Sequence, residues 1–272
     1  KARVACQGVP GAFSNQAAAR LFPGCIPRFV ETFPDVFSAV EKGEADYGIL
    51  PVENSSSGSV HEVYDLIIKH RFFIVAAAEI PVNHCLLALP GAKVEELKTV
   101  YSHPQALAQC AELISALNLE ARPYVNAAAA AQMVAQKGDN TICAIASSNA
   151  ASLYGLEVLK ENIQSAENNS TRFIAISRDL IIPPDANKIS LIFSLPHVTG
   201  SLYRILSRFA VAGLNLTKLE SRPTRSGSFE YLFYLDFEGD FGSPDTLNLI
   251  CALSEELPAF SFIGNYRELE TL

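Results

Sequence analysis

The chain has 272 residues, 49% of them hydrophobic and 18% charged, so it can bury a sizeable core in one large domain or two smaller ones. A net charge of −8 argues against binding to a nucleic-acid backbone, because that affinity comes largely from clustered Lys and Arg. The longest apolar tracts, such as residues 72–78, are much shorter than the roughly 18 residues of a membrane span. We therefore expect a globular protein that binds neither nucleic acid nor membrane.

The first 80 residues alternate between apolar runs and helical patterns, which is typical of a layered α/β fold. The expected strands cover residues 3–7, 26–30, 47–52 and 72–80, and the expected helices follow Ser14, Pro34 and Ser59. A second cycle has strands at residues 83–89, 99–102 and 141–146, and helices over residues 105–117 and 127–136. Two consecutive α/β lobes would have a cleft between them.

The predicted helix over residues 105–117 has two distinct faces. One is an apolar stripe with spacings of three and four, formed by Leu107, Cys110, Leu113, Ile114 and Leu117. Gln105 and Gln109 share a different, polar face. The sequence thus predicts two glutamines that point away from the lobe core.

A second domain is predicted to begin at Lys188, because the adjacent prolines Pro183 and Pro184 interrupt both helix and sheet in the linker 181–187. The domain contains expected strands at residues 188–195, 215–221, 229–238 and 260–266. Its two expected helices are one marked by Leu202, Ile205, Leu206 and Phe209 and one over residues 245–256. The resulting order is βαββαβ.

Cysteine and histidine usage gives no sign of a metal site or a disulfide framework. The six cysteines are far apart, have no CxxC pair, and several lie inside apolar runs, which indicates buried thiols in a reducing compartment. The five histidines show no HExxH or similar spacing, so each is interpreted as a surface or core residue. No cofactor fingerprint or phosphate loop is present either, and we expect neither metal nor cofactor.

The segment 168–173 (NNSTRF) places neutral hydrogen-bonding side chains and one arginine directly before an apolar run. An arginine offers a planar fork for a carboxylate, and the hydroxyl of Thr171 can donate to a reacting oxygen. The segment is consistent with a site, and equally with a capped turn that enters a strand.

Other candidate positions lie where strands lead into helices. Ser14, Ser55 to Ser59, and Ser102 precede expected helices, whose free N–H groups suit carboxylates; plain N-capping is the competing interpretation, because Ser59 and Ser102 fit the capping-box spacing. Glu53 and Asn54 follow an apolar strand at the end where α/β folds collect ligands. A carboxyl group held protonated there would act as an acid, with a solvated loop glutamate as the alternative.

Five ordered motifs resemble the prephenate dehydratase family across residues 1–180: PVENSSSGSV, NHCLLALPG, SHPQALAQC, CAIASSNAASLYGL and NNSTRF. The C-terminal portion, residues 188–272, resembles the ACT regulatory domain, with TGSL after its first strand and NLTKLESRP at its second. The resemblance implies a catalytic domain like a type 2 periplasmic binding protein. Lobe one would comprise about residues 1–80 and 160–180 and lobe two about 81–159, with crossings near Pro81 and near residues 157–163.

The resemblance also implies an activity: conversion of prephenate into phenylpyruvate with loss of carbon dioxide and hydroxide, without a metal or cofactor. In this interpretation Thr171 donates to the departing hydroxyl, Glu53 is a candidate general acid, and Asn54 and Gln109 complete the catalytic set. The residues expected to bind substrate are Arg172, Ser102, Ser14, Asn15, Ser55 and Phe173. Arg172 would either contact a substrate carboxylate or hold the loop that presents Thr171.

For the ACT domain, the resemblance implies L-phenylalanine as an effector and a homodimer or homotetramer formed through these domains. The expected effector site comprises Gly200, Ser201, Leu202, Leu214, Asn215, Leu216, Glu220, Ser221, Arg222 and Pro223. Ser201 departs from the usual glycine, alanine, leucine pattern, and GNYR at the end of the domain replaces the more frequent GSYP, so feedback inhibition is less secure than catalysis.

Several alternatives stay open at this level. The related arogenate dehydratases share the layout, and their substrate differs only by an amino group in place of a keto group. A two-lobed solute sensor without chemistry is a more distant alternative, because fold does not fix function. Lys1 is followed at once by the first strand, so a chorismate mutase domain or a transit peptide can be missing upstream; the expected location is the cytoplasm, or a plastid in the latter case.

Overall fold

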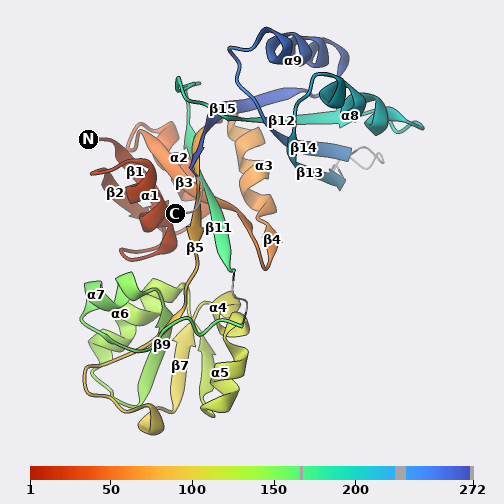
Figure 1. Ribbon diagram of the computed structural model, residues 1–272. Coiled ribbons are helices and arrows are strands. Elements are labelled where there is room, and N and C mark those ends of the chain that lie inside the picture. The colour runs from red at the N-terminus through yellow and green to blue at the C-terminus, as the bar shows by residue number, and fades with distance from the viewer. Residues whose placement is uncertain (166–167, 224–230, 270–272) are drawn as a thin grey trace. The chain divides into compact units, whose positions relative to one another are not determined.

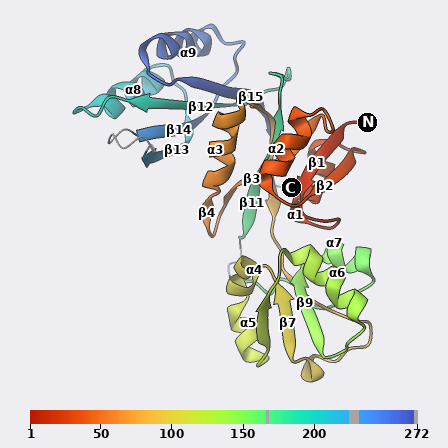
Figure 2. The same cartoon turned by 180° about the vertical axis from the view of Figure 1, so that it is seen from behind.

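The computed structural model describes residues 1–165, 168–223 and 231–269, and Figures 1 and 2 show its elements from opposite sides. The chain forms two compact units. The first unit contains residues 1–66 and 78–175, and the second contains residues 67–77 together with residues 176–269. Phe229 and Glu230 of one expected strand lie outside the described residues.

The first lobe of the first unit is built on a mainly parallel sheet. Its strands are β1 (Arg3–Gln7), β2 (Ile26–Val30), β3 (Tyr47–Asn54), β11 (Ser170–Ser177) and the end of β5 (Phe73–Pro81), in the order β5-β11-β3-β1-β2. Strand β1 pairs in parallel with both β2 and β3, as βαβ connections require. The helices of this lobe are α1 (Phe13–Leu21), α2 (Phe33–Glu41) and α3 (His61–His70), whose last residues belong to the second unit.

Local sequence explains where α2 begins. Thr32 Oγ1 accepts a hydrogen bond from the backbone N–H of Asp35, and the Asp35 carboxylate accepts one from the backbone N–H of Thr32. This reciprocal capping box satisfies two N–H groups that the helix itself leaves without partners. Pro34 occupies the first turn, where its missing N–H costs nothing.

The second lobe has a mixed sheet in the order β10-β6-β9-β7-β8. Its strands are β6 (Cys85–Ala88), β7 (Thr99–Ser102), β8 (Glu120–Pro123), β9 (Ile142–Ala146) and β10 (Glu157–Lys160). Its helices are α4 (Pro104–Gln109), α5 (Ala111–Ala116), α6 (Ala127–Lys137) and α7 (Ser148–Tyr154), with a short 3-10 turn at Val94–Glu96.

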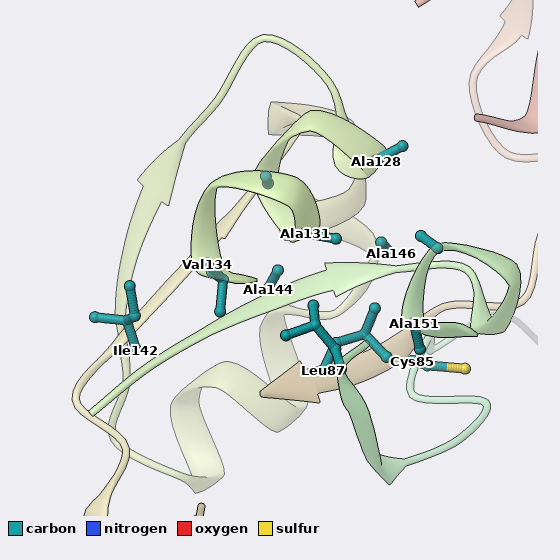
Figure 3. Packing of buried hydrophobic residues seen from close by; sticks show 12 residues of the cluster. Cys85, Leu87, Ala128, Ala131, Val134, Ile142, Ala144, Ala146 and Ala151 are labelled. Atoms are coloured by element: carbon teal, nitrogen blue, oxygen red, sulfur yellow. The ribbon is translucent and has the colours of Figure 1, made fainter. Parts of the chain in front are cut away.

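Both faces at the centre of this sheet are buried, because strands β6 and β9 are apolar at every position. Leu87 and Ala144 belong to one core cluster with α6 and α7, and Figure 3 shows Ala131 and Val134 of α6 close above them. The alternate residues of β6 and β9, such as Leu86 and Ile145, face a second cluster with α4 and α5. Continuous apolar strands therefore predict a sheet covered by helices on both faces.

The predicted single helix over residues 105–117 is wrong, because the chain leaves helical geometry at Cys110. The φ and ψ angles of this residue are −112° and 18°, and its N–H is shared between the carbonyls of Ala106 and Leu107. The apolar stripe continues across the break, so sequence periodicity does not reveal it. Strands β8 and β10 and helix α7 were not predicted.

The chain crosses between the two lobes twice. The first crossing, residues 82–84, lies directly after Pro81, at the end of β5. The second crossing begins after Lys160, and the chain is back in the first lobe at Ser170, slightly later than expected. The reason is that Glu157–Lys160 forms β10, which pairs with β6 inside the second lobe.

The C-terminal part of the second unit has the predicted βαββαβ order. Its elements are β12 (Lys188–Leu195), α8 (Ser201–Val211), β13 (Leu216–Pro223), β14 (Tyr231–Glu238), α9 (Pro244–Glu256) and β15 (Ser261–Leu269). The antiparallel strands follow the order β13-β14-β12-β15. Residues such as Leu191, Phe193 and Phe237 face α8 and α9 and form the core of this part.

Candidate active site

Asn54, the last residue of β3, organises a cluster of hydrogen bonds at the end of the first lobe sheet. Its Oδ1 accepts from the backbone N–H groups of Ser56 and Ser57, at 3.0 and 3.1 Å. Its Nδ2 lies 3.0 Å from Asn169 Oδ1 and 2.9 Å from Thr171 Oγ1, and donates to the Ser170 carbonyl as well. The side chain is buried, so its orientation is fixed by these partners.

Thr171 therefore uses its oxygen as an acceptor within the cluster. A threonine hydroxyl has one donor hydrogen and two acceptor positions. Among the described residues, Thr171 Oγ1 contacts only the Asn54 amide, which can only donate. The hydroxyl hydrogen of Thr171 is thus available to a ligand.

Two glutamines of α4 reach the same cluster from the second lobe. Gln105 Nε2 donates to Ser57 Oγ at 2.8 Å. Gln109 Oε1 accepts from Asn169 Nδ2 at 3.1 Å and lies 2.9 Å from His84 Nε2. The polar helix face expected for Gln105 and Gln109 is thus confirmed, and it joins the two lobes of the first unit.

Two expected serines have structural partners. Ser55 Oγ donates to the Asn168 carbonyl and accepts from the Ser170 N–H, both at 3.0 Å, so it ties the β3–β4 turn to the second crossing; β4 is Gly58–Ser59. Ser102 lies inside β7, is fully buried, and donates to the Ile145 carbonyl at 2.6 Å. Ser102 does not cap α4, because His103 does so by accepting from the Gln105 N–H.

A pocket of about 270 Å³ lies in the same unit. Its walls come from the loop after β1, the start of α1, α2, β3, β11, and the caps of α4, α6 and α7. The lining residues are Gln7, Gly8, Gly11, Ala12, Phe13, Ser14, Phe33, Pro51, His103, Val125, Asn126, Ala127, Ala128, Ser147 and Phe173. Three phenylalanine rings and several helix starts thus share one cavity.

The electrostatics of this pocket come from dipoles, because none of these lining side chains is a Lys, Arg, Asp or Glu. The N-terminal turns of α1 and α6 contribute Ala12 to Ser14 and Asn126 to Ala128, and their free N–H groups favour an anion. Asn126 caps α6 by accepting from the Ala129 N–H at 2.7 Å. Burial lowers the pKa of His103, which favours its neutral form.

Ser14 and Phe173 are the expected site residues that line the pocket. The alternative interpretation of Ser14 as an N-cap is wrong, because Ser14 lies within α1, whose N-cap is Ala12. Its hydroxyl donates to the Gln7 carbonyl at 2.7 Å. Asn15, in the first turn of the same helix, is not among the lining residues. The Asn54 cluster adjoins the pocket, because Thr171 and Phe173 lie two residues apart on one face of β11.

Alternation along the strands also places the two expected charged residues. Successive side chains of a strand point to opposite faces. Glu53 therefore shares a face of β3 with Pro51, which lines the pocket, whereas Arg172 points to the face of β11 opposite Phe173.

Sequence reasoning did not assign a site role to His84, Asn169, His103 or Asn126. Asn169 is part of the NNSTRF segment, and Asn126 precedes an alanine-rich helix, so both had a signal in the sequence. His84 and His103 lie within the NHCLLALPG and SHPQALAQC motifs, but they were given no role because their spacing matches no metal or catalytic pattern.

The residues expected to bind an effector lie at two places in the βαββαβ part. Gly200 is the cap of α8, with φ of 80°, and Ser201 and Leu202 form the first turn. Leu214 and Asn215 precede β13, and Asn215 Nδ2 donates to Glu238 at 3.1 Å. The others, Leu216, Glu220, Ser221, Arg222 and Pro223, lie in β13 itself, which is the first strand in the order of this sheet.

Within residues 1–165, 168–223 and 231–269, no three His, Cys, Asp or Glu side chains are grouped so as to hold a metal ion. In that same part of the chain, no helix is both long and apolar enough to span a membrane.

A two-lobed α/β unit with uncharged donors beside an aromatic pocket defines a class of protein that binds a small organic anion. Comparison with known proteins identifies the family: residues 4–181 match the model for prephenate dehydratase. A relative from Arabidopsis thaliana, "Arogenate dehydratase/prephenate dehydratase 1, chloroplastic", is 42% identical over 98% of this chain and 72% of its own length. The chain belongs to the prephenate dehydratase family.

Two solved structures share nearly the whole fold. One is a prephenate dehydratase in complex with L-Phe from Arthrobacter aurescens, with a TM-score of 0.87 and 29% identity over 97% of this chain and 89% of that chain. The other is described as "GqqA- a novel type of quorum quenching acylases", with a TM-score of 0.88 and 33% identity over 98% of both chains.

Proposed function

We propose that the protein is a dehydratase that converts prephenate into phenylpyruvate. The observation that carries the proposal is the Asn54 cluster, which leaves the hydroxyl hydrogen of Thr171 available beside an aromatic pocket. Membership of the prephenate dehydratase family supports a role for this hydrogen as the donor to a leaving hydroxyl.

The reaction needs no outside oxidant or reductant. The bond from the ring to its carboxylate carbon breaks, and its electron pair enters the ring as carbon dioxide leaves. The ring C–O bond breaks at the other end, and the departing hydroxide takes up a proton to become water. Because the ring becomes aromatic, the enzyme mainly has to position the substrate and stabilise the departing oxygen.

The pocket suits such a substrate. Phe13, Phe33 and Phe173 offer apolar surface to a six-membered ring, and the starts of α1 and α6 offer N–H groups to its carboxylates. Thr171 donates a hydrogen bond to the leaving oxygen, Gln109 supplies a further contact, and Glu53 is the candidate general acid. Arg172 holds β11 rather than touching substrate, because it points away from Phe173.

The direct test is incubation of the purified protein with prephenate, following phenylpyruvate by its absorbance in alkali. The proposal expects enzymatic turnover well above the spontaneous acid-catalysed reaction, and absence of turnover contradicts it. Arogenate should be tested in parallel, with phenylalanine as the product measured. This arm matters because the Arabidopsis relative is named for both activities.

A second candidate, acyl hydrolysis, is favoured by the likeness to the acylase structure. The cluster geometry is less suited to it, because Thr171 Oγ1 is approached by the Asn54 amide, which cannot remove its proton. Release of a fatty acid from an N-acyl substrate, without turnover of prephenate or arogenate, would favour this candidate. Binding of prephenate without any turnover would favour a sensor instead.

We also propose that the βαββαβ part is an ACT domain that binds L-phenylalanine and pairs with a second copy. A relative of the same fold was solved in complex with L-Phe. Strand β13 lies at one end of the strand order, where an edge favours pairing, and α8 begins at Gly200 with free N–H groups. Analytical ultracentrifugation with and without phenylalanine would distinguish monomer, dimer and tetramer.

The location in the cell belongs to the same proposal. The Arabidopsis relative is named chloroplastic, which supports a plastid as the alternative to the cytoplasm.

A further inference from the structure

His84 is a buried histidine that none of the roles above uses. It lies in the first crossing between the lobes and is 3% exposed. Its ring packs edge-on against Phe13, a pocket residue, with 6.2 Å between ring centres. Its Nε2 lies 2.9 Å from Gln109 Oε1, at the end of the hydrogen-bonded chain that begins at Thr171.

The donor and the acceptor of each hydrogen bond between Asn54 and His84 can be assigned from the backbone N–H groups that bind Asn54. The N–H groups of Ser56 and Ser57 can only donate, so the atom of Asn54 that faces them is the carbonyl oxygen. The Asn54 amide nitrogen must then face Asn169, whose side-chain oxygen Oδ1 accepts the hydrogen bond at 3.0 Å.

The same logic continues to His84. Because the Asn169 oxygen faces Asn54, its amide nitrogen faces Gln109. Asn169 Nδ2 donates to Gln109 Oε1 at 3.1 Å. His84 Nε2 faces that same oxygen, so Nε2 must carry the hydrogen. His84 Nδ1 is then a bare acceptor, and it has no partner among the described residues. Burial lowers the pKa of His84, against the opposing effect of Gln109, which agrees with a neutral ring.

Gln109 is left with a fixed orientation. Its carbonyl oxygen receives two donors, one from each side. Its amide nitrogen has no hydrogen-bond partner among the described residues. A glutamine held in this way offers donors to a ligand and never its acceptor.

We propose that His84 is a positioning residue that turns the amide nitrogen of Gln109 toward the substrate. Gln109 then donates a hydrogen bond to a carboxylate or hydroxyl oxygen and offers no acceptor to an ammonium group. The inference rests on the dehydratase function proposed above, because it needs a substrate at Gln109. His84 itself touches no reacting atom; it acts through Gln109.

The test uses a near-isosteric pair of variants of the full-length protein. In His84→Gln the amide nitrogen can take the place of Nε2, whereas in His84→Met no donor remains. We expect His84→Met to lower kcat/KM about 10-fold to 100-fold, as misplaced catalytic groups do, while His84→Gln restores most of the activity. Thermal unfolding of both variants provides the structural control. Equal loss in the two variants would overturn the proposal.

A double-mutant cycle tests whether His84 acts through Gln109. In the background Gln109→Met, the change His84→Met should have little further effect on kcat/KM, because the amide that it positions is gone. Full additivity of the two losses would contradict the proposal.

The tautomer of His84 can be determined independently of enzyme activity. Imidazole ¹⁵N NMR of histidine-labelled protein, with the His84 signals assigned by their loss in His84→Gln, should show a protonated Nε2 and a bare Nδ1. A protonated Nδ1 overturns the inference even in an active enzyme. If the wild type turns over neither prephenate nor arogenate, the proposed function fails instead, and the substrate part of the inference with it, whereas the tautomer still tests the hydrogen-bonded chain.

Discussion

Two backbone N–H groups decide how the side chains around Thr171 are oriented. The N–H groups of Ser56 and Ser57 hold the Asn54 carbonyl, so the Asn54 nitrogen must donate to Thr171 Oγ1. A threonine that already accepts from an amide keeps its single hydrogen available for another acceptor, such as a ligand. In the proposed mechanism, the hydrogen bond to the leaving oxygen is thus prepared by the turn after β3, before a substrate is bound.

This arrangement predicts different outcomes for two conservative changes of Thr171. Thr171→Val keeps the shape and removes the hydroxyl, so kcat for prephenate should fall by about 10²-fold. Thr171→Ser keeps the hydroxyl and should retain most of the activity. Steady-state kinetics measures both, and circular dichroism checks that the fold survives. A Thr171→Val enzyme as active as the wild type would remove Thr171 from the mechanism.

Buried thiols predict how stability changes with pH. Burial raises the pKa of Cys6, Cys110 and Cys143 to about 12, from an ordinary value of 9.0. Between these values the folded state keeps its protons and the unfolded state loses them. The stabilisation is therefore complete below pH 9 and is lost as the pH rises, by about 1.4 kcal/mol per pH unit and thiol at most.

Urea unfolding between pH 7 and pH 10.5 measures this slope. Cys143→Ala is the comparison, because it removes one of the three thiols. Its free energy of unfolding should fall less steeply above pH 9 than that of the wild type, although the variant is less stable at neutral pH. Parallel slopes would show that Cys143 is not responsible.

At this scale the sequence predicts residue types better than their partners. The motifs pointed to Asn54, Gln109 and Thr171, and the structure brings these three into one cluster. Ser102 looked equally suitable as a site residue, but its hydroxyl donates to the Ile145 carbonyl within the sheet of the second lobe. His84 lies within the NHCLLALPG motif, but its role was not predicted because it depends on a contact with a residue 25 positions away in the chain.

Among the elements, strands were easier to locate than helix ends. The expected strands 99–102 and 188–195 coincide with β7 and β12, because apolar runs between polar boundaries leave little freedom. Strand β8 was missed because all of its residues are exposed, so it carries no hydrophobic pattern. The break at Cys110 was missed because the apolar stripe runs through it.

The N-cap residue of helix α6 contributes to both the helix and the pocket. Asn126 caps the helix and lines the pocket at the positive end of the dipole. Removing the cap with Asn126→Ala should lower the free energy of unfolding by about 0.5–2 kcal/mol.

Asn126→Asp separates the two roles. Aspartate caps a helix as well as asparagine does, so stability should be kept, but its negative charge should repel a substrate carboxylate and raise KM. Chemical denaturation and kinetics with prephenate measure the two effects. A KM that is unchanged in Asn126→Asp would mean that no carboxylate binds at the start of α6.

At the scale of the whole molecule, sequence order and compact units do not coincide. Residues 67–77 interrupt the sequence of the first unit, yet they form one unit with residues 176–269. The sequence predicts a boundary in the linker 181–187 from its prolines, but it holds no local signal for this earlier segment. Residues far apart in the chain come together in this unit, since Ile67, Ile192 and Phe260 line one pocket.

This grouping predicts that residues 1–180 alone will not make a well-behaved domain. Ile67, Phe72 and Ile74 are nearly fully buried in the whole chain, and a Cβ on Gly264 would meet the backbone of Ile74, so β15 approaches it closely. Without residues 188–269, apolar side chains of this segment become exposed, at a cost of about 1.5–3 kcal/mol for each one fully uncovered. The truncated chain should bind the dye ANS, elute as aggregates in gel filtration, and unfold at a lower temperature than the full chain. A monomeric fragment with the melting temperature of the full-length protein would show that residues 67–77 do not depend on the C-terminal strands.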